Sequence, residues 1–279
     1  MDREPNGRGV LRPDRLPDLV RLPPGPGESH LVRWYWISRW NLPPGEHARQ
    51  DLIAFPAFNL VVTDHGVLLS GPTTRISHRD LHGRGFGVGA LLWPAATPLL
   101  TGDAASCVDR VTDFAAPELL DGVRRADPAS SPHAGAAAVA DWLCQGTPEP
   151  DPEALLANRV IAAVEAPQPP PDVAALAERV GVAVRTLQRL TRRYIGLSPL
   201  TLLQRRRIQE AADRVRSAET RSLADIAVDL GYTDHAHLSR EFRKVLGVSP
   251  SEYREVLRRD ADDPPANTKG VPGAECSGR

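Results

Sequence analysis

Two segments of the sequence place hydrogen-bonding side chains at helical spacing. If each segment is a helix, one side of it carries these residues: Arg185, Gln188, Arg189 and Arg192 in the first segment, and His235, Ser239, Arg240 and Arg243 in the second. An arginine can donate two parallel hydrogen bonds to guanine, and a glutamine can pair with adenine in a similar way. The residue types and their spacing therefore indicate surfaces that can hydrogen-bond to nucleic acid.

An internal repeat must position these two surfaces. LQRLTRRYIGLSP, which starts at Leu187, aligns with LSREFRKVLGVSP, which starts at Leu238. A short helix and a glycine precede each copy, LAERVG at 176–181 and IAVDLG at 226–231. A small residue, a glycine four positions later and an apolar anchor are typical of a helix-turn-helix. The two copies supply these in order as Ala177, Gly181 and Leu187, and as Ala227, Gly231 and Leu238.

The opposite side of each second helix is apolar and is predicted to face inward. Its residues are Leu187, Leu190 and Tyr194 in the first copy, and Leu238, Phe242 and Val245 in the second. Both helices end at a glycine, Gly196 or Gly247, that is followed by Ser-Pro, where serine caps a helix and proline opens it. Asp234 is placed to cap the second of these helices, and Ser249 with Glu252 makes a capping box.

Between the copies, residues from Pro199 to about Val215 predict one long helix. At 1.5 Å per residue it measures on the order of 25 Å, which suits a spacer that holds two recognition helices a DNA turn apart.

The repeat resembles a known family. IAVDLGYTDHAHLSREFRKVLGVSPSEYR is similar to the C-terminal signature of the AraC/XylS transcription regulators of bacteria, and LAERVGVAVRTLQRLTRRYIGLSP to their first helix-turn-helix. The resemblance covers about a third of the chain and implies two recognition helices in successive major-groove segments on one DNA face. The positions it assigns to base reading are Arg185, Gln188, Arg189, His235, Ala236, Ser239 and Arg240. Ala236 offers only a methyl contact, to thymine.

The other basic residues of this region are expected to contact phosphates or to lie on a solvated face. They are Arg192, Arg193, Arg205 to Arg207, Arg243 and Lys244. From Asp172 to Arg259 there are 17 Lys+Arg against 11 Asp+Glu, a net charge of +6, whereas the whole chain has a net charge of −1. A basic segment in a near-neutral chain suits phosphate binding by one domain.

The first half of the chain favours β-structure and then helices. Leu31–Ser38, Asp51–Thr63 and Arg84–Trp93 are rich in aromatic and β-branched residues and are separated by turn signals. Helices are expected near Pro117–Arg125, His133–Gln145 and Glu153–Val164. The prolines of APQPPPD, residues 166–172, cannot continue a helix. The predicted domains are an extended arm (1–30), a sensor or dimerisation domain (31–165), a Pro-rich linker (166–171), the DNA-binding domain (172–259) and a disordered tail (260–279).

The predicted fold class is α+β, with a cupin-like N-terminal β-barrel and its helices, then an all-α domain in which a linker helix joins two helix-turn-helix motifs. RWYWISRWNLP, QDLIAFPAFNLVV and GFGVGALLWP resemble the divergent sensor domain that precedes some AraC-type DNA-binding domains. That resemblance implies ligand binding or oligomerisation rather than catalysis. The candidate pocket residues are Trp34, Trp36, Phe58 and Trp93, together with Trp40 and Phe55, and packing of the barrel core is the alternative role for each.

No metal, cofactor or catalytic residue is predicted. His47, His65, His78 and His82 are dispersed, without an HxH followed by a spaced glutamate. His78 and His82 would share a metal only on a helix, whereas Ser77–Gly85 predicts a turn. His235-x-His237 starts a recognition helix, where DNA contact or packing is expected. The GRGFGVG run at 83–89 lies in a strand-like stretch without a following helix, so no phosphate cradle is expected there.

The cysteines and the hydropathy pattern predict a cytoplasmic protein. Cys107, Cys144 and Cys276 are odd in number and far apart, which argues against a disulfide framework. No apolar run approaches the roughly 20 residues that span a bilayer, and no apolar region follows the charged N-terminus. The expected partner is an operator in double-stranded DNA. A small-molecule effector, RNA polymerase and a second copy of the chain are candidate partners, and no membrane partner is expected.

Two alternatives stay open for the N-terminal half. One is a constitutive regulator whose sensor domain has lost its ligand. The other is a cupin enzyme or a DNA-repair activity fused to the reader, although Cys107 and Cys144 lack the Pro-Cys-His-type context that a repair methyltransferase needs. The effector, the operator, the regulated genes, the direction of regulation and the oligomeric state are not predicted.

Overall fold

The computed structural model describes residues 18–52, 56–145, 151–217 and 221–262. By their contacts the residues divide into two compact units. The first unit extends to Gln209 and includes Val245–Gly247, and the second comprises Glu210–Lys244 and the residues from Val248 onward. The boundary between the units therefore falls inside one helix, α7 (Pro199–Ser217).

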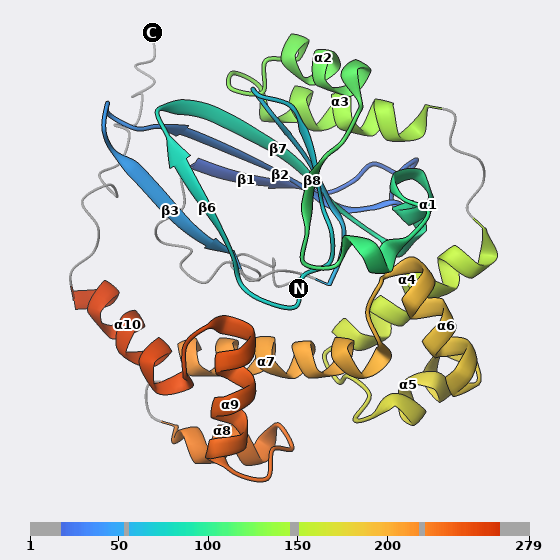
Figure 1. Cartoon of the computed structure of the whole chain (residues 1–279), viewed down its shortest axis with the longest axis vertical. Helices are drawn as coiled ribbons and strands as arrows, with labels where there is room; N and C mark the ends of the chain where they lie inside the picture. The colour runs from blue at the N-terminus through green and yellow to red at the C-terminus, as the bar shows by residue number, and fades with distance from the viewer. Residues whose placement is uncertain (1–17, 53–55, 146–150, 218–220, 263–279) are drawn as a thin grey trace, which may run out of the picture. The chain divides into compact units, whose positions relative to one another are not determined.

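Antiparallel strands make up the N-terminal part of the first unit (Figure 1). Their order is β1-β2-β7-β4-β5-β8 in one sheet and β3-β6 in a second. The predicted α+β class, with a β-rich first part followed by helices, is confirmed. The cupin-like barrel stays a prediction. No pairing joins the two sheets among the described residues. The strands are β1 (Asp18–Leu22), β2 (Val32–Asn41), β3 (His47–Leu52), β4 (Asn59–Thr63), β5 (Val67–Ser70), β6 (Ser77–His82), β7 (Arg84–Leu92) and β8 (Val111–Asp113).

The two faces of strand β2 differ in burial. Tyr35 and Ile37 are buried on one face, while Trp36 is half-buried on the other. In the register, Trp36 lies opposite Gly89 of β7. A Cβ at Gly89 would stand 2.0 Å from the indole ring of Trp36, so glycine leaves the space that the ring occupies.

Helices α2 (Pro117–Arg125) and α3 (Pro132–Cys144) pack on one face of the six-stranded sheet (Figure 1). Helix α4 (Pro152–Glu165) instead contacts the short 3-10 helix η2 (Pro94–Ala96). These three helices confirm the predictions for 117–125, 133–145 and 153–164 to within one residue. Two short elements, α1 (Thr97–Leu100) and η3 (Ala104–Cys107), follow η2.

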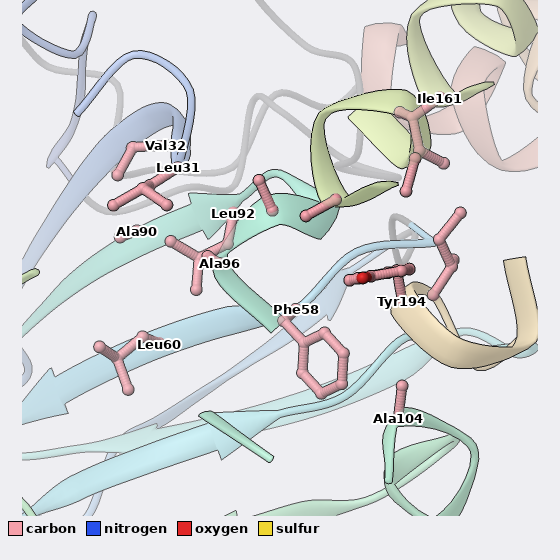
Figure 2. Packing of buried hydrophobic residues seen from close by; sticks show 14 of the residues in the cluster. Leu31, Val32, Phe58, Leu60, Ala90, Leu92, Ala96, Ala104, Ile161 and Tyr194 are labelled. Carbon is pink, nitrogen blue, oxygen red and sulfur yellow. The ribbon is translucent and has the colours of Figure 1, made fainter. Parts of the chain in front are cut away.

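One hydrophobic core extends from the sheet into the first helix-turn-helix. Figure 2 shows Leu60 and Phe58 near the strands, and Ile161 of α4 close to Tyr194 of α6 (Val184–Tyr194). The preceding helix, α5 (Val173–Val180), adds Leu176 to the same core. The first compact unit therefore contains α5 and α6 and does not end at 166–171. The predicted domain limits, which follow the repeat rather than the contacts, stay predictions.

The second unit is built around α8 (Leu223–Asp229), α9 (His235–Leu246) and α10 (Pro250–Asp262). Phe242 and Tyr253 are buried, with ring centroids 6.0 Å apart. Arg216 from the end of α7 donates a hydrogen bond to the Tyr253 hydroxyl at 3.0 Å. Helix α7 itself confirms the predicted long helix between the two copies of the repeat.

Several local predictions differ from the structure. The predicted arm contains β1, because residues 18–22 pair along β2. The turn predicted at 77–85 is wrong, because residues 77–82 form β6 by pairing with β3. Leu246 is the buried residue at the end of α9 and Val245 is only half-buried, since positions 238, 242 and 246 share one helical face. Helix α10 extends to Asp262, past the predicted start of the tail, while Phe55 and residues 263–279 lie outside the described residues.

Candidate nucleic-acid interface

The first helix-turn-helix consists of α5, a turn at Gly181 and α6. The Asp172 carboxylate caps α5 by accepting the backbone N–H of Ala175 at 2.8 Å. Gly181 has φ +75°, in the left-handed region that glycine adopts without strain, as expected for the turn. Leu187 and Leu190 are fully buried, which confirms the predicted inward face of α6.

The outward face of α6 is exposed. Its members are the three predicted base-reading residues and one predicted phosphate contact, Arg185, Gln188, Arg189 and Arg192. Arg189 also forms an ion pair with Glu153 of α4, with 2.7 Å between Nη2 and Oε1. Arg193 reaches the other oxygen of that carboxylate, with 2.7 Å between Nη1 and Oε2. Two cations of the first recognition helix are thus bound to one acidic side chain.

Around Glu153, a buried tyrosine adds two further contacts. The Tyr194 hydroxyl donates to Asp151 Oδ2 at 3.0 Å and lies 3.3 Å from Glu153 Oε2. Burial, and then the hydrogen bond to Asp151, raise the pKa of Tyr194 to about 12. The backbone N–H of Glu153 and the Tyr194 hydroxyl lower the pKa of Asp151. Both carboxylates lie 36 or more residues before the arginines in sequence, and no local motif predicted this cluster.

The second helix-turn-helix repeats the same local design. Ser222 caps α8 by accepting the backbone N–H of Asp225 at 3.0 Å, and Asp234 caps α9 through the N–H of His237 at 2.7 Å, as predicted for Asp234. The turn glycine, Gly231, also has φ +75°. Tyr232 packs edge to face on His237, with centroids 5.3 Å apart, so His237 has a packing role. Leu238 and Phe242 are fully buried, as predicted for this helix.

A hollow of about 510 Å³ joins the outward face of α9 to the start of α10. Three cations, three hydroxyls and an imidazole line it, and such groups can bind phosphate oxygens or base edges. Within it, Ser239 Oγ and His235 Nε2 are 3.3 Å apart. The lining residues are His235, Ser239, Arg240, Arg243, Lys244, Ser249 and Ser251.

The hollow brings together five of the predicted DNA-contacting residues, three for bases and two for phosphates. Ala236 is exposed but does not line the hollow. Ser251 was not predicted. Its position directly after the Ser-Pro that opens α10 is the signal that could have identified it, because the first residues of a helix present free backbone N–H groups.

The predicted capping box is present beside the hollow. The N–H of Ser249 donates to Glu252 Oε2 at 2.6 Å, and the N–H of Glu252 donates to Ser249 Oγ at 3.2 Å. Arg243 donates to the same carboxylate at 3.0 Å. These hydrogen bonds, led by the one from the Ser249 backbone, lower the pKa of Glu252 to about 2. Glu252 therefore stays ionised and offsets part of the charge of Arg243, whereas Arg240 and Lys244 are exposed.

Two predicted phosphate contacts, Arg205 and Arg206, are corrected because both are buried. Arg205 is only 3% exposed, and burial lowers its pKa to about 10. Arg206 is also buried, and Arg207 donates a hydrogen bond to the carbonyl oxygen of Pro171. Arg205 and Arg206 lie three and four positions after the buried Leu202, so helical spacing turns them toward the protein.

Among the described candidate pocket residues of the N-terminal half, two share a partner. Trp34 and Trp93 both lie against the Arg33 guanidinium, each at 4.8 Å from the ring centroid. The ring of Trp36, a residue of β2, packs over Gly89 of β7, and its Nε1 donates to Asn59 Oδ1 at 3.1 Å. Phe58 is buried in the hydrophobic core, which favours the packing alternative for that residue.

The histidines of the small sheet, at which no metal site was predicted, lie on β3 and β6. His47 and His82 are cross-strand neighbours, with ring centroids 6.1 Å apart. In the part of the chain that the structure describes, no group of three or more His, Cys, Asp or Glu side chains is arranged to hold a metal.

Known proteins resemble the C-terminal part of this chain in sequence. Residues 176–256 match the family model described as a helix-turn-helix domain. The transcriptional activator RhaS of Escherichia fergusonii is 36% identical over 81 residues, 29% of each chain. An AraC-like transcription regulator of Streptomyces lividans is 39% identical over 83 residues, 30% of this chain and 27% of the other. The C-terminal domain is of the AraC type.

The AraC-type match leaves most of each relative uncovered. This chain spans less than a third of the length of both relatives. The solved DNA-binding domain of AdpA in complex with a target DNA is 27% identical, covering 40% of this chain and 98% of the other. Its TM-score of 0.33 is too low to indicate a shared arrangement. Residues 20–113 match a family described only as a domain of unknown function (DUF6597), in agreement with a divergent N-terminal half.

None of the described helices combines the length and the apolar character that crossing a membrane requires.

Proposed function

We propose that this protein is a sequence-specific regulator of transcription that reads DNA through α6 and α9. One observation carries the proposal: each of these helices buries an apolar face and exposes hydrogen-bonding and basic residues on the other. Arg185, Gln188 and Arg189 would read bases from α6, and His235, Ala236, Ser239 and Arg240 from α9. Arg192, Arg193, Arg243 and Lys244 would contact phosphates.

The N-terminal half would control DNA binding by the C-terminal part. We infer that it binds a small-molecule effector or joins two copies of the chain, and that it performs no catalysis. The relatives named as transcriptional activators favour activation, with RNA polymerase as a further partner. A regulator that binds the chromosome of a bacterium works in the cytoplasm. The alternative is a constitutive regulator, and a thermal-shift screen separates the two, because a ligand that binds only the folded state raises its unfolding temperature.

The test of DNA reading begins with mapping the bound sites across the genome with the full chain. The highest-ranked site and a scrambled duplex of equal length and composition are then titrated over a range of salt concentrations. We expect the mapped site to bind on the order of 10³-fold or more tightly than the scrambled duplex. We also expect both affinities to fall steeply with salt, since phosphate contacts release counterions. Equal affinity for the two duplexes would contradict sequence-specific reading.

A further inference from the structure

One carboxylate of the N-terminal half forms ion pairs with two arginines of the first recognition helix. The two oxygens of Glu153 lie 2.7 Å from Arg189 and 2.7 Å from Arg193, one oxygen for each. The Glu153 side chain is 23% exposed, while both arginines are about 60% exposed. The acidic partner is therefore held in place, and the arginines are the groups that could turn away.

Helix α4, which carries Glu153, is fixed to the sheet domain at two further points. Asn158 accepts the backbone N–H of Ala95 at 2.8 Å and donates to the carbonyl oxygen of His30 at 2.8 Å. Near the end of the helix, Glu165 is paired with Arg33 of β2. Helix α4 thus has polar contacts with the strand region at its middle and at its end, and with α6 at its start.

An N–H group of Arg189 that is paired with Glu153 cannot at the same time donate a hydrogen bond to DNA. Bidentate recognition of guanine uses two parallel N–H groups of the guanidinium, and Nη2 of Arg189 is already paired with Glu153 Oε1 at 2.7 Å. A carboxylate beside the recognition helix also repels the DNA phosphates. Recognition of a base by the edge of the Arg189 guanidinium that faces Glu153 therefore requires this ion pair to open.

We propose that Glu153 is a positioning residue that competes with DNA for Arg189 and Arg193 and thereby restrains the first recognition helix. The proposal rests on the function proposed above, and it adds a regulatory role for α4. A shift of α4 relative to α6 that lengthens these two ion pairs raises DNA affinity. The strand region can produce such a shift, because it holds α4 through Asn158 and Glu165.

The first experiment compares two charge-matched variants of the full chain. Glu153→Gln removes the charge that binds the arginines. Glu118→Gln removes an exposed charge in the first turn of α2 and changes the net charge by the same amount. We expect Glu153→Gln to bind the mapped site about 2- to 30-fold more tightly than wild type, the range of two exposed ion pairs, and Glu118→Gln to match wild type. Equal affinities of the two variants would overturn the proposal.

A second pair of variants tests whether contact or charge is responsible. Glu153→Asp keeps the charge but withdraws the carboxylate by one methylene, so we expect it to gain affinity as well. In an Arg189→Ala, Arg193→Ala background, most of the gain from Glu153→Gln should disappear, because both competed groups are absent. A gain that persists in full there, or no gain in Glu153→Asp, would show a diffuse charge effect and overturn the proposal.

Failure of the proposed function would be visible separately. If wild type does not distinguish the mapped site from the scrambled duplex, the reading function itself fails. If wild type binds specifically and the Glu153 variants behave as their controls do, only the restraint by Glu153 fails. Unfolding temperatures of all variants show whether each one is folded at the temperature of the titration.

Discussion

The contact between Trp36 and Gly89 predicts a large effect from one added methyl group. In Gly89→Ala the new Cβ would lie 2.0 Å from the ring of Trp36, about 1.5 Å closer than carbon atoms normally approach. The ring cannot move without cost, because its Nε1 donates to Asn59 at 3.1 Å. Overpacking costs roughly 1–3 kcal/mol, and a lost hydrogen bond about 0.5–1.5 kcal/mol.

A smaller effect acts in the opposite direction. Alanine reduces the freedom of the unfolded chain, which stabilises the fold by about 0.4–1 kcal/mol. The net expectation for Gly89→Ala is a loss of roughly 2 kcal/mol. For a unit of about 200 residues that corresponds to a fall of about 4–8 °C in the unfolding temperature.

The matched control is Gly87→Ala on the same strand. Its Cβ would lie 3.3 Å from Trp36, a distance that a small shift of the ring accommodates. The assay is thermal unfolding followed by circular dichroism, with tryptophan fluorescence to report on the ring. Trp36→Val in the Gly89→Ala background should recover part of the loss, because it removes the clash. If Gly89→Ala unfolds at the same temperature as Gly87→Ala, the reasoning about this contact is refuted.

Three further predictions concern the second unit. Arg240→Ala should cost about 1–3 kcal/mol of binding to the mapped site and relax the base preference at one position, measured with a panel of single-base variants; an unchanged preference would exclude base reading by this residue. Lys244→Ala should weaken binding to all duplexes alike and reduce the magnitude of the salt slope by about 1; a sequence-dependent loss would contradict a phosphate contact. The pKa of Glu252 is about 2, below its ordinary 4.5, so its ionised form stabilises the fold fully above pH 4.5, and this contribution is lost as the pH falls toward 2. Glu252→Ala should therefore unfold at a lower temperature than wild type at pH 7, by a margin that shrinks below pH 4.5, and a margin independent of pH would contradict this origin.

Local signals were sufficient to predict both helix-turn-helix units. The turn glycines, Gly181 and Gly231, adopt the left-handed conformation that their place in the repeat implies. The Asp234 cap and the Ser249–Glu252 capping box form as predicted. In each case the partners lie within a few residues of one another in sequence, so the pattern itself specifies the contact.

Contacts between distant segments could not be predicted in this way. Glu153 and Arg189 meet only because α4 and α6 share a core, and neither residue is unusual in its own segment. Arg205 was expected at the surface from its charge, yet the fold buries it. Strand β6 lacks an apolar alternation, and its pairing with β3 defines it. Residue type indicates what a side chain can do, but burial decides whether it is available.

The shared core of α4, α5 and α6 has a consequence for protein engineering. A chimera that joins these recognition helices to a foreign sensor would naturally be cut at the proline-rich segment, residues 166–171. That cut leaves Ile161 behind and exposes the face of Tyr194 that packs near it (Figure 2). A junction placed before Asp151 would carry α4 along with the reader and keep the Tyr194 hydroxyl bonded. We therefore expect the portable module of this protein to begin one helix earlier than its sequence repeat.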